Sequence, residues 1–207
     1  MRACVINERT EIPFLEETLL LICAYLLGSV PTGLLLARAL GVNIRESGSG
    51  NIGATNVYRT MGRTVGILTL IGDCLKGLLP VLAAKWLGLS DLWIAAIGLA
   101  AFLGHVYTIF LCFKGGKGVA TALGVFLGTS PLSVLFAVLI FALVLYRWRY
   151  ISLASITAAA VIPVVVWLSG CNPELTLMTL AIAGVVIFRH RENISRLRAG
   201  TENKFKA

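Results

Sequence analysis

The stretch 118–146, GVATALGVFLGTSPLSVLFAVLIFALVLY, determines the topology of the whole chain. Its 29 residues contain no charged side chain and could form one long membrane-spanning helix. The break GTSP at 128–131 argues against a single helix, because proline and the residues before it end helices. We therefore expect two helices, over 118–129 and 132–146, with a reversal of the chain between them.

The composition indicates a membrane protein. Of the 207 residues, 57% are hydrophobic and 14% are charged. This hydrophobic fraction is larger than a soluble domain of this length needs. The apolar segments are continuous and show no period of two, which disfavours a β-barrel. We predict an all-α, polytopic integral membrane protein with segments over 18–37, 65–87, 92–112, 118–129, 132–146, 151–168 and 175–188.

The distribution of Lys and Arg predicts the topology. Of the 18 cations, 14 lie in four stretches, namely the loop 38–64, the turns near 114–117 and 147–149, and the tail from 189. All four share one side only if 118–146 crosses twice, and the positive-inside tendency then places that side in the cytoplasm. Seven segments follow, with the N-terminus outside and the C-terminus cytoplasmic. The twelve residues of 118–129 reach only about 18 Å, so five spans with a re-entrant pair remain the alternative.

The ends of the chain and its cysteines constrain the interpretation further. Residues 1–17 are polar and carry four acidic side chains, unlike a signal peptide, and we treat them as an extension of one domain over 18–207. The net charge of +8 accompanies no nucleic-acid motif, so we expect no nucleic-acid partner. The five cysteines form no CxxC pair and predict packed side chains, with no metal or cofactor; a Cys4–Cys171 bridge stays open.

Three short stretches at segment ends are suited to hold phosphate. The first, RESGSGNIGATN over 45–56, contains G-x-G-x-x-G, but no strand precedes it, which excludes a dinucleotide fold. Glycine still allows backbone N–H groups to approach a phosphate. A flexible cytoplasmic turn is the alternative. The residues expected to bind substrate or act on it are Arg45, Ser47, Gly48, Ser49, Gly50, Asn51, Thr55 and Asn56.

The second stretch, FKGGKG over 113–118, precedes the short segment. It departs from the Walker pattern at 111 and 118, so ATP binding is not supported. A glycine turn at a helix start offers free N–H groups and a positive dipole end. A tight turn with a topology signal is the alternative. The expected site residues are Lys114, Gly115, Gly116, Lys117 and Gly118.

The third stretch, RHRENISR over 189–196, continues the last segment beyond the membrane. His190 and Asn193 are three residues apart and share a helical face, as do Asn193 and Arg196. A basic juxtamembrane helix is most often an anchor for anionic lipid. The His/Asn pair beside an arginine favours a site instead.

Ionisable groups also lie at membrane depth. Asp73 and Lys76 share a helical face, so we expect them to pair or to line a wet cavity, with structural and functional roles equally open. His105 ends a segment beside Gly104 and is interpreted as a hydrogen-bonded structural residue. The break GSVPTG at 28–33 predicts a kink in the first segment.

Taken together, these residues resemble the bacterial acyl-phosphate-dependent glycerol-3-phosphate acyltransferases, the PlsY family. The resemblance covers nearly the whole chain from Tyr25 and departs from the family pattern at Asn43 and Thr108. It implies transfer of a fatty acyl group from acyl phosphate to the sn-1 hydroxyl of glycerol 3-phosphate, giving lysophosphatidic acid and phosphate. It also implies a bacterial inner-membrane enzyme with a cytoplasmic active site. The implied partners are both substrates and membrane lipid, and the oligomeric state stays open.

The resemblance also implies roles for individual residues. Arg45 and Ser49 match essential residues of the first motif, and His190 and Asn193 match those of the third. The glycines at 115, 116 and 118 match the family's proposed glycerol-3-phosphate loop, and Glu202 matches a position important for structural integrity. Arg149 and Ser152, within the matching stretch 149–155, are expected to bind substrate.

The sequence contains no serine elbow, Cys–His pair or His-x4-Asp motif, so an acyl-enzyme is not expected. We therefore hypothesise direct attack by the glycerol hydroxyl on the acyl phosphate. Arg45, Lys117 and the loop N–H groups would neutralise the phosphates, and the proton would pass to the departing phosphate or to His190. An organophosphate transporter is the alternative, and it would need an inverted repeat with a site at the midplane.

Overall fold

The computed structural model describes residues 13–170 and 172–205. All regular secondary structure in these ranges is helical, which confirms the predicted all-α class. The elements are α1 (Pro13–Ser29), α2 (Thr32–Ala39), α3 (Ala54–Met61), α4 (Arg63–Trp86), α5 (Asp91–Val106), η1 (Ile109–Leu111), α6 (Val119–Thr129), α7 (Pro131–Trp148), α8 (Ile151–Leu168), α9 (Pro173–Arg189) and α10 (Arg191–Arg198). The Cys4–Cys171 bridge and most of the polar extension lie outside the described residues.

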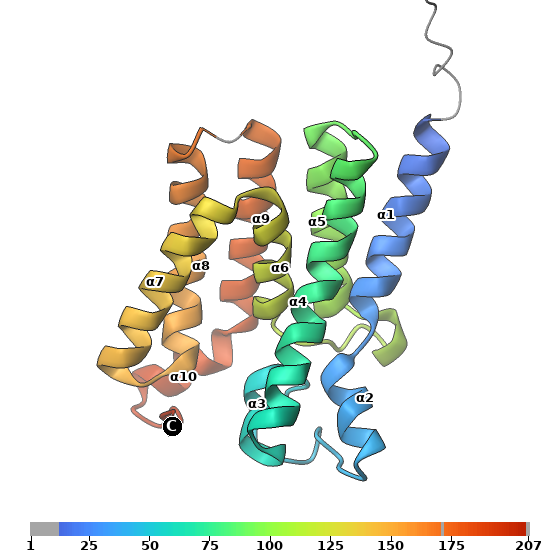
Figure 1. The fold of residues 1–207 in the computed structure, drawn as a ribbon. Coiled ribbons are helices and arrows are strands. Elements are labelled where there is room, and N and C mark those ends of the chain that lie inside the picture. Colours follow the sequence, from blue (N-terminus) through green and yellow to red (C-terminus); the bar gives the residue numbers. More distant parts are fainter. Residues whose placement is uncertain (1–12, 171, 206–207) are drawn as a thin grey trace, which may run out of the picture.

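The helices form a bundle of membrane dimensions. Four spans are long and apolar enough to cross a bilayer, namely α4, the segment 91–111, α7 and α8, and the bent pairs α1–α2 and α9–α10 raise the number to six. The short fourth predicted segment, 118–129, is α6, which has only 11 residues, as the sequence indicated. Figure 1 shows the chain reversing between α6 and α7, and the break at Ser130–Pro131 produces this reversal.

One predicted helix boundary needs correction, and one predicted kink is confirmed. The first helix begins at Pro13 and not at residue 18, so part of the polar extension belongs to α1. The first segment also bends by 43° between α1 and α2, at the proline that predicted a kink. The bend leaves the carbonyl of Val30 without its helical partner, and Lys76 donates to that oxygen at 2.7 Å.

The core depends on close helix crossings. A Cβ on Gly77 would lie 2.2 Å from the carbonyl oxygen of Thr121, and one on Gly124 would lie 1.9 Å from that of Cys74. These two glycines bring α6 against α4 at backbone contact distance, as is common where membrane helices pack. On the outer side, α7 exposes large apolar side chains such as Phe136 and Leu139, which suits contact with lipid tails.

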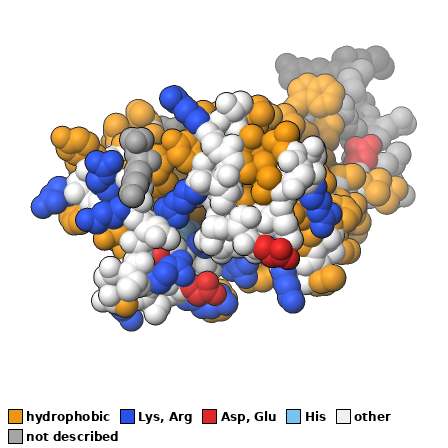
Figure 2. Space-filling model, turned by 90° about the horizontal axis from the view of Figure 1, so that it is seen from below, with side chains coloured by type: hydrophobic (Ala, Val, Ile, Leu, Met, Phe, Trp, Pro, Cys, Tyr) orange, Lys and Arg blue, Asp and Glu red, His pale blue; other side chains and the backbone are white. Residues whose placement is uncertain are grey.

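The basic stretches gather at one end of the bundle. The short helices α2, α3 and α10 lie together at the lower end in Figure 1. Seen from below in Figure 2, this end carries many Lys and Arg side chains among a few acidic ones. The sequence predicted that all four basic stretches share one side, and their arrangement confirms it.

Candidate active site

The first loop, residues 40–53, is held from within by a side chain of α3. The amide nitrogen of the buried Asn56 donates to the carbonyls of Ser47 and Asn51 at 3.0 and 2.8 Å. Its amide oxygen accepts from the backbone N–H of Ser49 at 2.8 Å. Gly48 and Gly50 have φ of +61° and +68°, which favours glycine. The loop therefore folds around Asn56, whose polar atoms are used within it.

The glycine loop, residues 114–118, is held from outside. The N–H groups of Gly115 and Gly116 donate to the carbonyls of Val106 and His105 on α5, both at 3.1 Å. The carbonyls of the same two glycines accept from Arg189, at 3.0 and 3.3 Å. These two amides were expected to bind phosphate, but they are hydrogen-bonded to α5. Lys117 and the start of α6 are therefore the remaining candidates in this loop for binding an anion.

The start of α6 lies beside Lys117. Gly118 precedes the helix with φ of +83°, and the first N–H groups of a helix have no intrahelical acceptor. Lys117 donates to the side-chain oxygen of Asn193 at 2.5 Å. Burial lowers the pKa of Lys117, and Glu202 opposes that effect. The amine and the positive end of α6 thus converge on the same space.

The third stretch contributes His190 and Asn193, both buried. The Nδ1 of His190 lies 2.8 Å from the carbonyl of Val186, which can only accept, so Nδ1 carries the proton. In the neutral ring, Nε2 is then an acceptor. Asn193 donates to Glu202 at 2.7 Å, while its oxygen accepts from Lys117.

Glu202 organises one wall of the site. Its Oε1 accepts from Ser152 and Asn193, and its Oε2 accepts from Arg196, each at 2.7 Å. Burial alone would raise the pKa of Glu202, but these three donors outweigh burial and hold the pKa below its usual value. The carboxylate therefore joins α8 to α10 and reaches Lys117 through Asn193.

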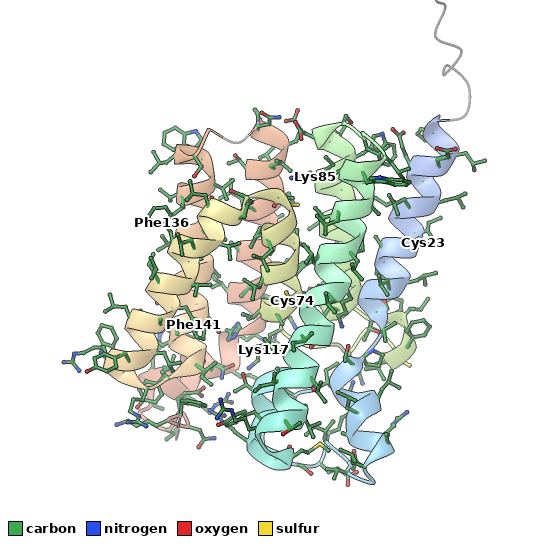
Figure 3. The ribbon with its side chains drawn as sticks, viewed as in Figure 1. Cys23, Cys74, Lys85, Lys117, Phe136 and Phe141 are labelled. Carbon is green, nitrogen blue, oxygen red and sulfur yellow. The ribbon has the colours of Figure 1, made fainter. Side chains whose placement is uncertain are left out.

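These elements enclose two adjoining cavities. The larger, of about 370 Å³, is lined among others by the predicted residues Gly48, Ser49, Asn51, Thr55, Asn56, Asp73, Lys117, Gly118, Ser152, His190, Asn193 and Glu202. The smaller, of about 200 Å³, is lined by Arg45, Ser49, Gly50, Asn51, Ile52, Gly115, Lys117, Arg189, Arg191 and Glu192. Ser49, Asn51 and Lys117 line both. Figure 3 shows Lys117 pointing into the interior near the lower end of the bundle.

Several predicted site residues lie outside both cavities. Arg149 donates to the carbonyl of Phe205 at 3.2 Å and holds the C-terminal segment. The hydroxyl of Ser47 donates to the carbonyl of Asn43, and Lys114 contributes its carbonyl to Arg45. The expectation that they bind substrate is not supported by their positions. Gly116 and Lys76 also line neither cavity.

The charged groups at membrane depth form a cluster of three. Asp73 lies 2.8 Å from Lys76 and 3.6 Å from Nδ1 of His105, and all three side chains are buried. The predicted ion pair is therefore present. Asp73 and His105 also line the larger cavity. The structural interpretation of His105 misses this position, because the sequence alone does not reveal that α5 ends beside α4.

Comparison with known proteins identifies the family. A family model described as "Glycerol-3-phosphate acyltransferase" matches residues 18–200. The chain belongs to this family. Curated relatives named glycerol-3-phosphate acyltransferase include one from Geotalea daltonii, 70% identical over 92% of this chain and 98% of the relative. Another, from Geobacter sulfurreducens, is 68% identical over 93% of this chain and 100% of the relative.

Solved structures agree with this assignment. PlsY (YgiH), described as an integral membrane glycerol 3-phosphate acyltransferase, matches in its glycerol 3-phosphate form with a TM-score of 0.89 at 44% identity. That match covers 92% of this chain and 96% of PlsY. The lysophosphatidic acid form matches with a TM-score of 0.87. The present chain is therefore an integral membrane protein of the same fold.

Some residues that line the two cavities were missed from the sequence. Arg59, His105, Ser155, Arg196 and Asn203 line the larger cavity, and Arg189, Arg191 and Glu192 line the smaller one. Four of these eight belong to the quoted stretch 189–196, so a signal was present. Ser155 also lies within the matching stretch 149–155. Asn203 carried no signal, since only the packing of the C-terminal segment brings it to the cavity.

Proposed function

We propose that this chain transfers a fatty acyl group from an acyl phosphate to the sn-1 hydroxyl of glycerol 3-phosphate. The products are lysophosphatidic acid and inorganic phosphate. The observation that carries this proposal is that Lys117 lies between two adjoining cavities and lines both. A reaction between two phosphate-bearing molecules requires their phosphates to be neutralised side by side, and one shared amine does this.

The lining of the larger cavity suits a lipid substrate. Leu70, Val119, Phe141 and Ile151 contribute apolar surface next to Lys117 and His190. We place the acyl tail along these side chains. Phe141, which belongs to α7, is labelled in Figure 3. The smaller cavity is lined mainly by cations and backbone, which suits a water-soluble phosphate.

The chemistry needs no enzyme nucleophile. The glycerol hydroxyl oxygen attacks the acyl carbonyl carbon, a new C–O ester bond forms, and the C–O bond to the phosphate breaks. The hydroxyl proton passes either to an oxygen of the departing phosphate or to Nε2 of His190, which is a free acceptor in the neutral ring. Lys117 and the start of α6 stabilise the negative charge that develops on the carbonyl oxygen.

The proposed orientation places the active site on the cytoplasmic side of the bacterial inner membrane. The Lys- and Arg-rich end of the bundle carries both cavities, and the positive-inside tendency assigns that end to the cytoplasm. In a variant whose five native cysteines are replaced by serine, a cysteine at exposed Gly200 should react with an impermeant thiol reagent only in inverted vesicles. A cysteine at exposed Ser169, at the other end of α8, should react only in right-side-out cells.

The donor is tested directly. Purified protein in detergent is incubated with glycerol 3-phosphate and either palmitoyl phosphate or palmitoyl-CoA, and lysophosphatidic acid and phosphate are measured. Equal release of both products with palmitoyl phosphate alone supports the proposal. Turnover only with the thioester would contradict the proposed donor. Uptake of glycerol 3-phosphate into vesicles without any lysolipid would support the transporter instead.

A further inference from the structure

The two central glycines of the glycine loop have no backbone hydrogen-bonding group left for a ligand. Both N–H groups donate to the end of α5, at 3.1 Å each. Both carbonyls accept from Arg189, at 3.0 Å for Gly115 and 3.3 Å for Gly116. A loop that cradled an anion would aim its N–H groups at the cavity. In this loop the N–H groups of Gly115 and Gly116 donate to α5 instead. The presence of glycine at these two positions therefore has a cause other than anion binding.

Close packing against His105 provides that explanation. A Cβ on Gly116 would lie 2.2 Å from Nε2 of His105, and a Cβ on Gly115 would lie 2.0 Å from the carbonyl oxygen of His105. Distances this short exclude any side chain at either position. His105 cannot easily move away, because its ring is buried against Asp73, which also pairs with Lys76. One side of the loop therefore packs closely against His105, whose position is fixed by Asp73.

Arg189 holds the opposite side. It is the last residue of α9, and its guanidinium bonds two successive carbonyls while lying 5.9 Å from the ring centroid of Tyr107. The planar fork of a guanidinium suits two acceptors at once, which an ammonium does not. The next residues along the chain bring His190 and Asn193 to the larger cavity. Arg189 thus fixes the glycine loop relative to α9 and α10.

The consequence falls on Lys117, the next residue after Gly116. Its amine must reach Asn193 on α10, and it does so at 2.5 Å. A loop anchored at only one end could rotate about its two glycines and carry Lys117 away from both cavities. With α5 on one side and Arg189 on the other, that rotation is blocked.

We propose that Arg189 is a positioning residue, which acts on the reaction by clamping the carbonyls of Gly115 and Gly116 and so aligning Lys117 with both cavities. Gly115 and Gly116 serve close packing against His105 and do not bind the anion themselves. This inference rests on the proposed function, because it takes Lys117 as the group that contacts the substrate phosphates.

The first experiment compares Arg189→Gln and Arg189→Lys with Arg198→Gln, which removes an exposed cation at the end of α10. Losing charge-assisted hydrogen bonds should lower kcat/KM of Arg189→Gln by about 10- to 100-fold. Lysine restores the charge but not the fork, so Arg189→Lys should recover only part of this loss. The melting temperature should change little in all three variants. A loss in Arg189→Gln no larger than in Arg198→Gln would overturn the proposal.

A double-variant cycle separates a clamp from direct contact with substrate. Gly116→Ala displaces the same loop. Adding Arg189→Gln to this variant should lower kcat/KM by less than about a further threefold, because both substitutions act by displacing that loop. If Arg189 itself binds a phosphate, the two losses should multiply, and the proposal fails. If Gly116→Ala does not fold, Lys117→Arg takes its place with the same two outcomes.

The clamp is also tested without turnover. The dissociation constant for glycerol 3-phosphate, measured from its effect on the melting temperature, should rise in Arg189→Gln and show the same non-additivity. Wild-type protein that binds glycerol 3-phosphate but makes no lysolipid from acyl phosphate counts against the proposed donor alone. Losses of binding that multiply in the double variant count against the clamp alone.

Discussion

The first loop and the glycine loop are both rich in glycine, yet they are built in opposite ways. Residues 40–53 fold around Asn56, which lies only a few residues away in sequence and bonds three carbonyls and one N–H of that loop. The glycine loop depends on α5 and on Arg189, which is 74 residues from Gly115. A glycine-rich stretch can therefore be a turn that is stabilised by its own neighbours in sequence. It can equally be a loop that is held in place by helices distant in sequence.

The largest expected effect comes from removing the amine of Lys117, which the glycine loop positions. Lys117→Ala should reduce turnover by about 100- to 1,000-fold, because it removes a positive charge aimed at both phosphates. Lys114→Ala, in the same loop but outside both cavities, should lose less than about threefold of kcat/KM. The assay is lysophosphatidic acid formation at varied concentrations of each substrate. Equal losses in the two variants would mean that the loop acts through its total charge and not through the position of Lys117.

The first loop should lose stability when the side chain of Asn56, around which it folds, is removed. Asn56→Ala leaves three carbonyls and one N–H without their partner, and the expected destabilisation is about 2–4 kcal/mol. Asn43→Ala removes an exposed amide within the same loop that makes none of these bonds, and it should cost less than about 0.5 kcal/mol. Thermal unfolding in detergent measures both. An unchanged melting temperature for Asn56→Ala would show that the loop does not depend on this residue.

A smaller, pH-dependent effect should come from Glu202, at the far end of the chain of bonds through Asn193 to Lys117. Its pKa is lowered in the folded protein, so the stability it contributes is present above its unfolded pKa of about 4.3 and is lost as the pH falls below that value. The melting temperatures of wild type and Glu202→Gln should therefore differ at pH 7 and approach each other as the pH falls below the unfolded pKa. A difference that grows on acidification contradicts the assigned sign.

The smallest expected effect concerns Arg149, which the sequence assigned to substrate binding. Because its guanidinium contacts the carbonyl of Phe205 outside both cavities, Arg149→Gln should change KM for either substrate by less than about threefold. Arg147→Gln, two residues earlier and exposed, is the matched control. A tenfold rise in KM specific to Arg149→Gln would restore the substrate-binding role and would mean that the C-terminal segment moves when substrate binds.

Elements with a local cause were predictable. Pro131 blocks continuation of a helix through its own ring, so the split of 118–146 into α6 and α7 followed from one residue. His190 and Asn193 share a face through helical periodicity, and both line the larger cavity. The prediction that the three stretches meet also held, because charge asymmetry places their segment ends on one side of a membrane.

The all-helical membrane fold, the short helix α6 and the meeting of three basic stretches at one end could be predicted from local features. Helix breaks, hydrophobic length and charge bias each depend on a few neighbouring residues. The packing of Gly115 and Gly116 against His105, their bonds to Arg189, and the contact of Arg149 with Phe205 outside both cavities could be seen only in the folded molecule. Each of these depends on the contact of segments distant along the chain. Such contacts are set by how helices pack in three dimensions, and no local pattern of residues encodes them.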